Sequence, residues 1–204
     1  MTLSVNDLNN MHLDVLREIG NIGAGNAATA LATLINKKVD MGVPVIQILD
    51  YNDITKILGG EEAVVAGIYF GVDGDINGNI MFLLDIKSAK KLIGMLMGTD
   101  DTREELDEME CSALQEIGNI LSGSYISSLS TLTGLFINLS VPSLNVDMAG
   151  AILSVPAIQF GHISDKVLLI ETTLKDGNDL INANFFLIPD VDSFDVLLKS
   201  LGVY

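Results

Sequence analysis

The 204-residue sequence contains one cysteine, four prolines and no tryptophan. Its single thiol, Cys111, cannot form an intramolecular disulfide, which is typical of a protein in a reducing compartment. The sequence also lacks any apolar run of the roughly 18 to 20 residues needed to span a bilayer. Its first residues lack the basic start and apolar centre of a signal peptide. These absences predict a cytoplasmic protein without membrane insertion, in which Cys111 is a small residue near a helix start rather than a nucleophile.

Basic residues are scarce: 11 lysines and arginines stand against 27 aspartates and glutamates, which gives a formal charge of −16. Such a charge repels phosphate backbones, so nucleic-acid binding would need a local basic patch and is not expected. The one small basic cluster, Lys87, Lys90 and Lys91, is expected to be a solvated helix face. The two histidines, His12 and His162, stand apart from any cluster at metal-ligand spacing, so no metal site is expected.

What the sequence does contain is 49% hydrophobic residues and an internal repeat. Residues 14–44 align without a gap on residues 112–142, and 12 of the 31 aligned positions are identical. Ordinary residue usage would give roughly 6% identity by chance. The match resumes after an insertion, where residues 81–98 resemble residues 185–202. The chain is therefore predicted to be a duplication.

Both halves show the same order of elements, so we expect one domain, 1–204, built from two repeats of about 1–102 and 103–204. The predicted elements are helices over 5–37 and 103–134, extended runs over 38–49 and 135–147, a hairpin in each half, and closing helices over 88–97 and 192–201. Because the strands come in antiparallel pairs, the predicted fold class is α+β, an α/β sandwich. The repeats are expected to be related by a pseudo-two-fold axis and to share one mainly antiparallel sheet packed with helices.

A glycine-rich segment of the first repeat could be read as a nucleotide-binding loop. The letters G-A-G-N-A-A at 23–28 match a dinucleotide fingerprint, in which backbone amides hold a pyrophosphate. That fingerprint needs a strand before its first glycine, whereas the preceding residues have helical periodicity, and the second repeat lacks the pattern. We instead expect the small residues to be packing spacers at a close helix crossing. They are Gly20, Gly23, Ala24, Gly25, Ala27 and Ala28.

The repeat retains a polar stripe on its long helix. With 100° per residue, Asp14, Glu18 and Asn21 lie on one face, and the last two are side by side at i and i+3. The apolar residues behind them are Val15, Leu16, Ile19 and Ile22. In the second repeat the stripe is Ser112, Glu116 and Asn119, backed by Ala113, Leu114, Ile117 and Ile120. A solvated helix face would explain one copy, but not an exposed asparagine, a mediocre helix former, in both.

Written with its spacing, each copy reads [DS]-x3-E-x2-N-x22-P. The positions are Asp14, Glu18, Asn21 and Pro44, and then Ser112, Glu116, Asn119 and Pro142. This pattern resembles the signature of the CheC/CheX/FliY family of chemotaxis phosphatases, and the resemblance runs over essentially the whole chain. It implies a CheC-like fold and hydrolysis of the phosphoaspartate of the response regulator CheY. Neither copy departs from the pattern, so both sites are expected to be intact.

The resemblance also implies roles for the residues at the pattern positions of this chain. Asn21 and Asn119 would orient a water in line with the phosphorus, because a neutral carboxamide is tolerated beside an anionic phosphoryl group. Glu18 and Glu116 would pair with the active-site lysine of the regulator. Mg²⁺ is expected in the regulator's own pocket, and no cofactor of the chain's own is expected. The supporting residues are Asp14, Ser112, Pro44 and Pro142, the prolines fixing the exit of the first strand beneath each site.

A second partner implied by the family is the receptor deamidase CheD, whose binding would couple phosphatase activity to receptor modification. The candidate contact is Asp147, in the segment D-M-A-G-A after the second site; the alternative for Asp147 is a helix cap. A rival interpretation of the whole chain is a non-catalytic scaffold for CheD and phosphorylated CheY, or a flagellar-switch component. The complete Glu–Asn pairs favour turnover, because a scaffold has no need of the asparagine.

Overall fold

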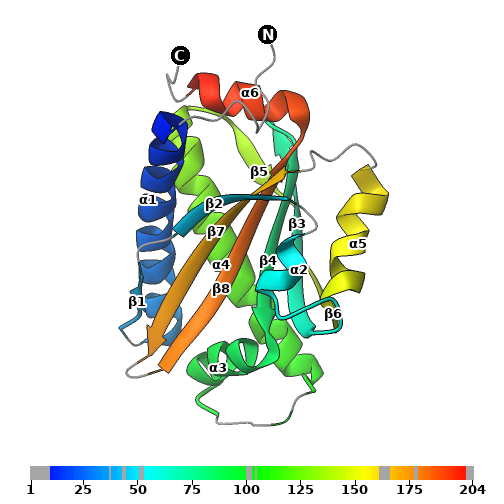
Figure 1. Ribbon diagram of the computed structural model, residues 1–204. Helices are drawn as coiled ribbons and strands as arrows, with labels where there is room; N and C mark the ends of the chain where they lie inside the picture. Colours follow the sequence, from blue (N-terminus) through cyan, green and yellow to red (C-terminus); the bar gives the residue numbers. More distant parts are fainter. Residues whose placement is uncertain are drawn as a thin grey trace.

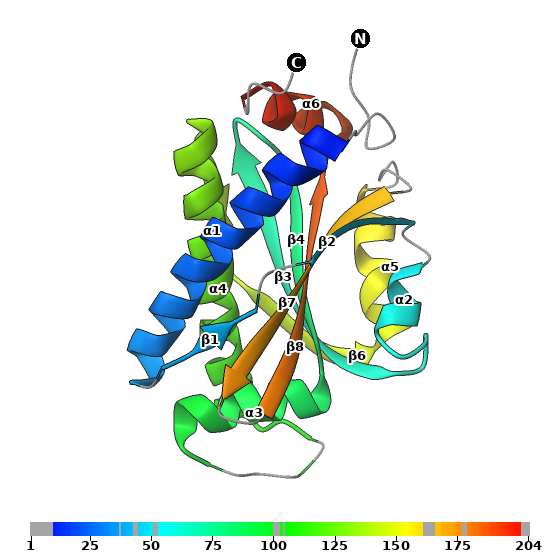
Figure 2. The same ribbon diagram turned by 60° about the vertical axis from the view of Figure 1, so that its left-hand side comes forward.

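The computed structural model describes residues 10–36, 38–42, 45–50, 53–99, 103, 105–160, 166–176 and 179–200. The helices are α1 (Asn10–Ile35), α2 (Ile54–Ile57), α3 (Ile86–Met97), α4 (Glu108–Thr133), α5 (Ala149–Phe160) and α6 (Val191–Ser200). The strands are β1 (Asp40–Met41), β2 (Val45–Asp50), β3 (Val64–Gly74), β4 (Gly78–Asp85), β5 (Ile137–Leu139), β6 (Ser143–Met148), β7 (Lys166–Asp176) and β8 (Asp179–Pro189). They form three layers, with α1 and α4 on one face of the sheet and α2 and α5 on the other (Figures 1 and 2). Helices α6 and α3 lie at opposite ends of the sheet, at the top and bottom of Figure 1.

The sheet is shared between the two repeats. Its order is β1-β7-β8-β4-β3-β5, with β2 also paired to β7 and β6 also paired to β3, and every pair is antiparallel. At its centre β4 pairs with β8, so that Met81 lies opposite Phe186 and Phe82 opposite Phe185. The sequence repeat relates Met81 to Phe185 and Phe82 to Phe186. The repeat therefore converts the Met81–Phe186 pair into the Phe82–Phe185 pair, and the reverse. The predicted α+β class with a shared antiparallel sheet is confirmed.

Each extended run that was predicted as one strand is broken in two. On β3, Val72 pairs with Leu139 and Tyr69 with Ser143, so three steps along β3 match four along the neighbouring run. This is a β-bulge of one residue between β5 and β6, and Pro142 lies in it. Proline has no N–H to give to the ladder, and a bulge at a sheet edge is one of the few places in a sheet that tolerates it.

The opposite edge of the sheet has the same irregularity. On β7, Lys175 pairs with Asp40 and Glu171 with Val45, so four steps along β7 match five along the neighbouring run. Pro44, the counterpart of Pro142, falls between β1 and β2 and lies outside the described residues. The prediction that it fixes the exit of the strand therefore stays a prediction for the first repeat.

The main core fills the space between the sheet and the two long helices. Leu16 and Ile19 of α1 are buried there, together with their counterparts Leu114 and Ile117 of α4. Full burial of such a side chain contributes about 1.5 to 3 kcal/mol. The other four residues of the predicted apolar face lie at its edge and are only half-buried: Val15, Ile22, Ala113 and Ile120. A second cluster, under α2 and α5, covers the other face of the sheet.

Helices α1 and α4 run in opposite directions and pack closely (Figure 2). A Cβ added at Gly23 would lie 2.6 Å from Cδ2 and 3.3 Å from Cα of Tyr125, and Asn26 Nδ2 donates to Ser128 Oγ at 2.8 Å. The predicted role of packing spacer is thus confirmed for Gly23. It is wrong for Gly25, where an added Cβ would have no neighbour within 4 Å.

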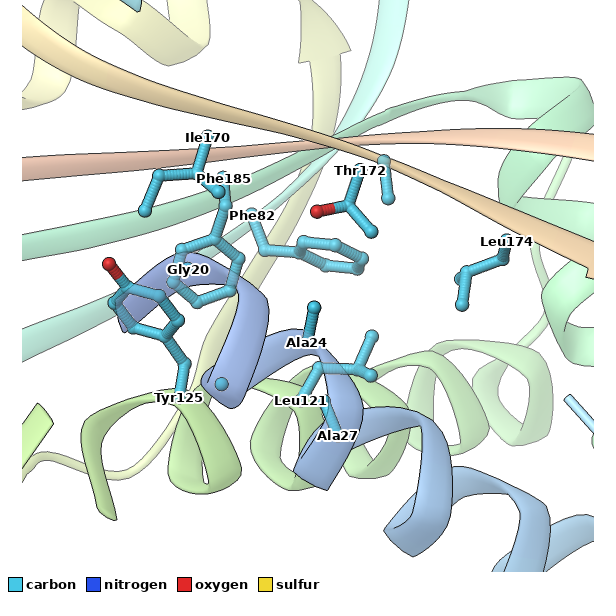
Figure 3. Close-up of a pocket in the computed structure, with 12 residues that line it drawn as sticks. Gly20, Ala24, Ala27, Phe82, Leu121, Tyr125, Ile170, Thr172, Leu174 and Phe185 are labelled. Atoms are coloured by element: carbon cyan, nitrogen blue, oxygen red, sulfur yellow. The ribbon is translucent and has the colours of Figure 1, made fainter. Parts of the chain in front are cut away.

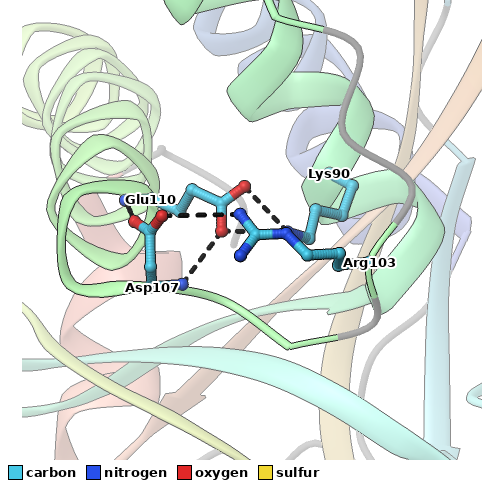
Figure 4. A network of polar contacts seen from close by, with 4 residues as sticks. All are labelled: Lys90, Arg103, Asp107 and Glu110. Carbon is cyan, nitrogen blue, oxygen red and sulfur yellow. Dashed lines mark hydrogen bonds and ion pairs between the residues drawn. The ribbon is translucent and has the colours of Figure 1, made fainter.

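Helix α4 begins with a capping box that is joined to α3 by a buried ion pair (Figure 4). Asp107 Oδ1 accepts from Glu110 N, and Glu110 Oε2 accepts from Asp107 N, each at 2.9 Å. Lys90 Nζ of α3 donates to both carboxylate oxygens of Glu110, at 2.7 and 2.9 Å. The Lys90 side chain is only 8% exposed, so the expectation of a solvated lysine face is wrong for this residue, although Lys87 and Lys91 are exposed.

The capping box also corrects a helix boundary, because it starts α4 at Glu108 rather than at the predicted 103. The end of α4 is set by Gly134, whose φ of 72° is left-handed and suits glycine. Helix α5 entered the sequence analysis only as the helix that Asp147 would cap in the alternative interpretation, since the letters A-G-A-I-L-S-V-P-A-I-Q-F show no polar stripe and include a proline. It covers the second face of the sheet beside α2 (Figure 1).

Candidate functional site

The first polar stripe lies on the solvent side of α1. Glu18 is exposed and Asn21 is half-buried, and both lie inside an unbroken helix, three residues apart. At this spacing the Cβ atoms of two helical residues are about 5 to 6 Å apart. The structure therefore presents a carboxylate and a carboxamide next to each other, as the sequence predicted.

The second stripe lies on the solvent side of α4, where Glu116 and Asn119 are both exposed. Because α1 and α4 run in opposite directions, the two stripes begin near opposite ends of the helix pair (Figure 2). In the described part of the chain, the side chains of Glu18, Asn21, Glu116 and Asn119 make no hydrogen bond or ion pair. Their polar groups are thus available to an incoming molecule.

The first position of each motif is tied to its own helix. Asp14 Oδ1 accepts from Arg17 Nη1 at 2.5 Å, in an exposed pair worth at most about 1 kcal/mol. Ser112 Oγ donates to the carbonyl of Glu108 at 2.9 Å. Both contacts lie within the helix, in the turn before the glutamate of each stripe. A guanidinium near Glu18 is one difference between the two sites, since the equivalent position in α4 is Gln115.

The proline of the second motif lies close to α4. Gln115 Nε2 donates to the carbonyl of Pro142 at 3.4 Å, one residue before Glu116. This contact joins the bulge between β5 and β6 to the helix that carries the second stripe. No sequence pattern indicates this contact, because Gln115 and its counterpart Arg17 differ between the repeats.

Asp147 lies on the edge strand β6, far along the chain from either stripe. It is exposed, its backbone is in register with Val65 of β3, and its Oδ1 accepts from the backbone N–H of Met148 at 2.7 Å. Helix α5 begins only at Ala149. The N–H that Asp147 accepts from belongs to the residue before α5 and not to the first turn of that helix. The structure therefore gives the helix-cap interpretation no support.

An apolar pocket lies among side chains of the two long helices and the sheet (Figure 3). It lies between α1, α4 and the sheet, where the Tyr125 and Phe185 rings are 5.4 Å apart. Its lining is Gly20, Gly23, Ala24, Ala27, Phe82, Leu121, Tyr125, Ile170, Thr172, Leu174, Ala183 and Phe185. Burial raises the pKa of the Tyr125 phenol, which stays neutral. No stripe residue lines this space, which is the packing gap left by small residues of α1.

The described residues contain no group of three or more histidine, cysteine, aspartate or glutamate side chains arranged to hold a metal ion. None of their helices has the length and apolar character needed to cross a membrane.

The thiol of Cys111, at the start of α4, is expected to react slowly. Burial raises its pKa above the ordinary value, and the carboxylates of Asp107, Glu110 and Glu108 raise it further. Because the thiolate is the reactive form, alkylation by iodoacetamide at pH 8 should be slower than for N-acetylcysteine, and should accelerate as the pH rises further. Mass spectrometry of the labelled protein measures this rate; alkylation at pH 8 as fast as that of the free thiol would contradict it.

Comparison with known proteins places these features in a family. A family model described as the CheC-like family matches residues 11–48 and 109–146, the segments that carry the two stripes. The chain is 37% identical over 202 residues to the CheY-P phosphatase CheC of Bacillus subtilis, with 97% of each chain covered. It is 32% identical over 144 residues to the flagellar motor switch phosphatase FliY of the same organism, covering 70% of this chain and 37% of the relative.

The fold has its own counterpart among solved structures. The crystal structure of FliY from Thermotoga maritima superimposes with a TM-score of 0.78 at 24% identity, covering 96% of this chain and 98% of that one. The three-layer arrangement with a shared antiparallel sheet is thus an observed architecture.

Proposed function

The chain belongs to the CheC-like family, and on that premise we propose that it hydrolyses the phosphoaspartate of the response regulator CheY. The observation that carries the proposal is the Glu–Asn pair on the solvent side of α1 and of α4, with all four side chains unengaged among the described residues. An acyl phosphate is labile, so the protein needs only to place a water and to hold the transition state. A helix face with one carboxylate and one carboxamide can do both.

The asparagines are proposed to orient the water. The carboxamide of Asn21 or Asn119 offers one acceptor and two donors, and it carries no charge that would repel the phosphoryl group. The water attacks phosphorus in line, the bond from phosphorus to the aspartyl oxygen breaks, and the carboxylate leaves with that electron pair. The products are inorganic phosphate and the free aspartate, and the proton of the water goes to solvent or phosphate. Mg²⁺ in the regulator's pocket would neutralise charge on the phosphoryl oxygens.

The glutamates are proposed to dock the regulator. A carboxylate beside a phosphoryl group is repulsive unless it meets a cation, and the regulator's active-site lysine supplies one. At 4 Å such a pair gains about 4 kcal/mol at the effective dielectric of a protein surface. Glu18 and Glu116 are exposed and point from the outer helix layer, where a second protein can reach them.

Reversal of both docking charges is expected to abolish binding. In the variant Glu18→Lys with Glu116→Lys, a lysine would face the lysine of the regulator, and like charges in contact cost several kcal/mol. The affinity for beryllofluoride-activated CheY, measured by calorimetry, should fall by at least about 10²-fold.

The matched control is Glu61→Lys with Glu62→Lys, which changes the net charge equally at two exposed positions before β3. This control should bind nearly as well as wild type. Equal affinities of the stripe variant and the control would remove the docking role.

The experiment that tests the function follows the decay of phosphorylated CheY with and without the purified chain. Faster decay, with release of inorganic phosphate, supports hydrolysis. The rival function, a scaffold, predicts binding of phosphorylated CheY with an unchanged decay rate. This comparison therefore separates the two functions in one assay.

Binding of CheD is a further part of the proposal and rests on the family resemblance. Asp147 is the proposed contact, supported by its exposure on the edge strand β6 beside helix α5. An acidic side chain there suits a partner that presents a basic group, as does the chain's net charge of −16.

A further inference from the structure

Two glycines share the polar stripes with the Glu–Asn pairs. On a helix with 100° per residue, Gly25 lies about midway in angle between Glu18 and Asn21, one turn beyond Asn21 toward the C-terminus. Gly123 lies in the same relation to Asn119 in the second repeat. The two glycines are among the positions that are identical in the repeats.

Packing within the chain does not explain these glycines. Apart from its chain neighbours and the backbone of its own helix, a Cβ added at Gly25 or at Gly123 would have no heavy atom of the described chain within 4 Å. By contrast, a Cβ at Gly23 would lie 2.6 Å from Tyr125, and one at Gly118 would lie 2.5 Å from Ile68. Glycine is the least favourable helix residue apart from proline. Gly25 and Gly123 thus weaken two helices at positions where a Cβ would meet no other part of the described chain.

The direction of helical side chains shows what a substitution would cover. Each Cα–Cβ bond tilts toward the N-terminus, so a residue at i+4 covers the surface above residue i. A side chain at position 25 would therefore lie over Asn21, and one at position 123 over Asn119. Glycine leaves the C-terminal flank of both carboxamides uncovered.

We propose that Gly25 and Gly123 are positioning residues of the two sites. This proposal rests on the proposed function. In their role the two glycines let the loops of CheY that carry the phosphoryl group come close to the helix beside the carboxamide. Close approach places the phosphorus within reach of the water that the asparagine orients. A methyl group there would hold the regulator back by a fraction of an ångström and a longer side chain by about 1 Å or more, and a displacement of about 1 Å can slow a reaction about 10²-fold.

The test uses variants with one working site. In an Asn119→Ala background, Gly25→Ala and Gly25→Gln are compared with the unchanged first site; in an Asn21→Ala background, Gly123→Ala and Gly123→Gln are compared with the second. The rate of phosphate release at saturating phosphorylated CheY should fall about 10-fold for alanine and about 10²-fold or more for glutamine. The same substitutions should raise Tm by about 2 to 4 °C, because both residues form helix better than glycine.

The combination of higher Tm and lower rate identifies the role. A lower Tm would mean that the glycines are needed for folding, and the proposal would be wrong. Thr33→Gln, at an exposed position two turns beyond Gly25, is the control and should leave the rate unchanged. Thr33→Gln slowing the reaction as much as Gly25→Gln would also contradict a local role.

The outcomes separate this proposal from the proposed function. If Gly25→Gln keeps the full rate while Asn21→Ala in the same background loses it, the glycines have no positioning role and the phosphatase function stands. If Asn21→Ala with Asn119→Ala also keeps the full rate, the function assigned to the stripes fails, and the glycine proposal fails with it.

Discussion

Dephosphorylation of CheY should slow by about 10² to 10³-fold when Asn21 and Asn119 are both replaced by alanine. Removal of one hydrogen-bonding group that acts in a transition state typically costs this much. Here each carboxamide is the neutral group that would hold the attacking water, and alanine offers neither donor nor acceptor. The measurement is the first-order decay of phosphorylated CheY at saturating concentrations of the variant chain.

The single variants are informative because the chain has two sites. Asn21→Ala keeps the second site and Asn119→Ala keeps the first. Each single variant should therefore lose only the part of the dephosphorylation rate that its altered site contributes. The control is Asn145→Ala with Asn182→Ala, two exposed asparagines of the sheet. That variant should dephosphorylate CheY at the wild-type rate. A double stripe variant as active as this control would show that the asparagines do not position the water.

Loss of the lysine in the buried ion pair should destabilise the fold by about 3 to 5 kcal/mol. The Lys90→Met variant keeps the length of the side chain but leaves the Glu110 carboxylate, 4% exposed, without its charge partner. The cost is large because Glu110 is also fixed by the capping box and cannot turn to solvent without losing that bond (Figure 4). Urea unfolding measures the change in the free energy of unfolding.

The matched control is Lys87→Met on the same helix. Lys87 is exposed, so its replacement should change stability by no more than about 0.5 kcal/mol. Lys90→Met with Glu110→Leu should recover much of the loss, because an apolar pair of similar volume replaces a buried ion pair well. That double variant loses the bond from Asp107 N to the Glu110 carboxylate, at a cost of about 1 kcal/mol. Equal effects of Lys90→Met and Lys87→Met would exclude a buried pair.

Local periodicity explains why so much of the architecture was predictable. The helices that carry Glu18 and Glu116 follow from a 3.6-residue pattern within one segment, and the hairpins follow from their turn residues. The second copy added what one copy could not, because Asn21 and Asn119 become a signal only when they recur. The sequence predicted that all four side chains are exposed. The structure agrees for Glu18, Glu116 and Asn119, whereas Asn21 is half-buried.

The features that were missed depend on contacts between distant segments. Lys90 is buried because Glu110, twenty residues away, meets it, and no pattern around Lys90 indicates this. The bulge at Pro142 depends on the register against β3, which a single strand sequence does not contain. Gly23 and Gly25 look alike in the sequence, yet only the position of Tyr125 decides which of them is a spacer.

The contact between Gly23 and Tyr125 has a consequence for the history of the duplication. The repeat relates Gly23 to Leu121 and Tyr125 to Ala27, so the counterpart of this contact is Ala27 with Leu121, both in the lining of the apolar pocket. A first half paired with its own copy would set glycine against alanine and leave a void. A second half paired with its own copy would set leucine against tyrosine and collide. At this contact each half is thus the complement of the other half and not of itself, so two copies of either half alone could not replace the present pair.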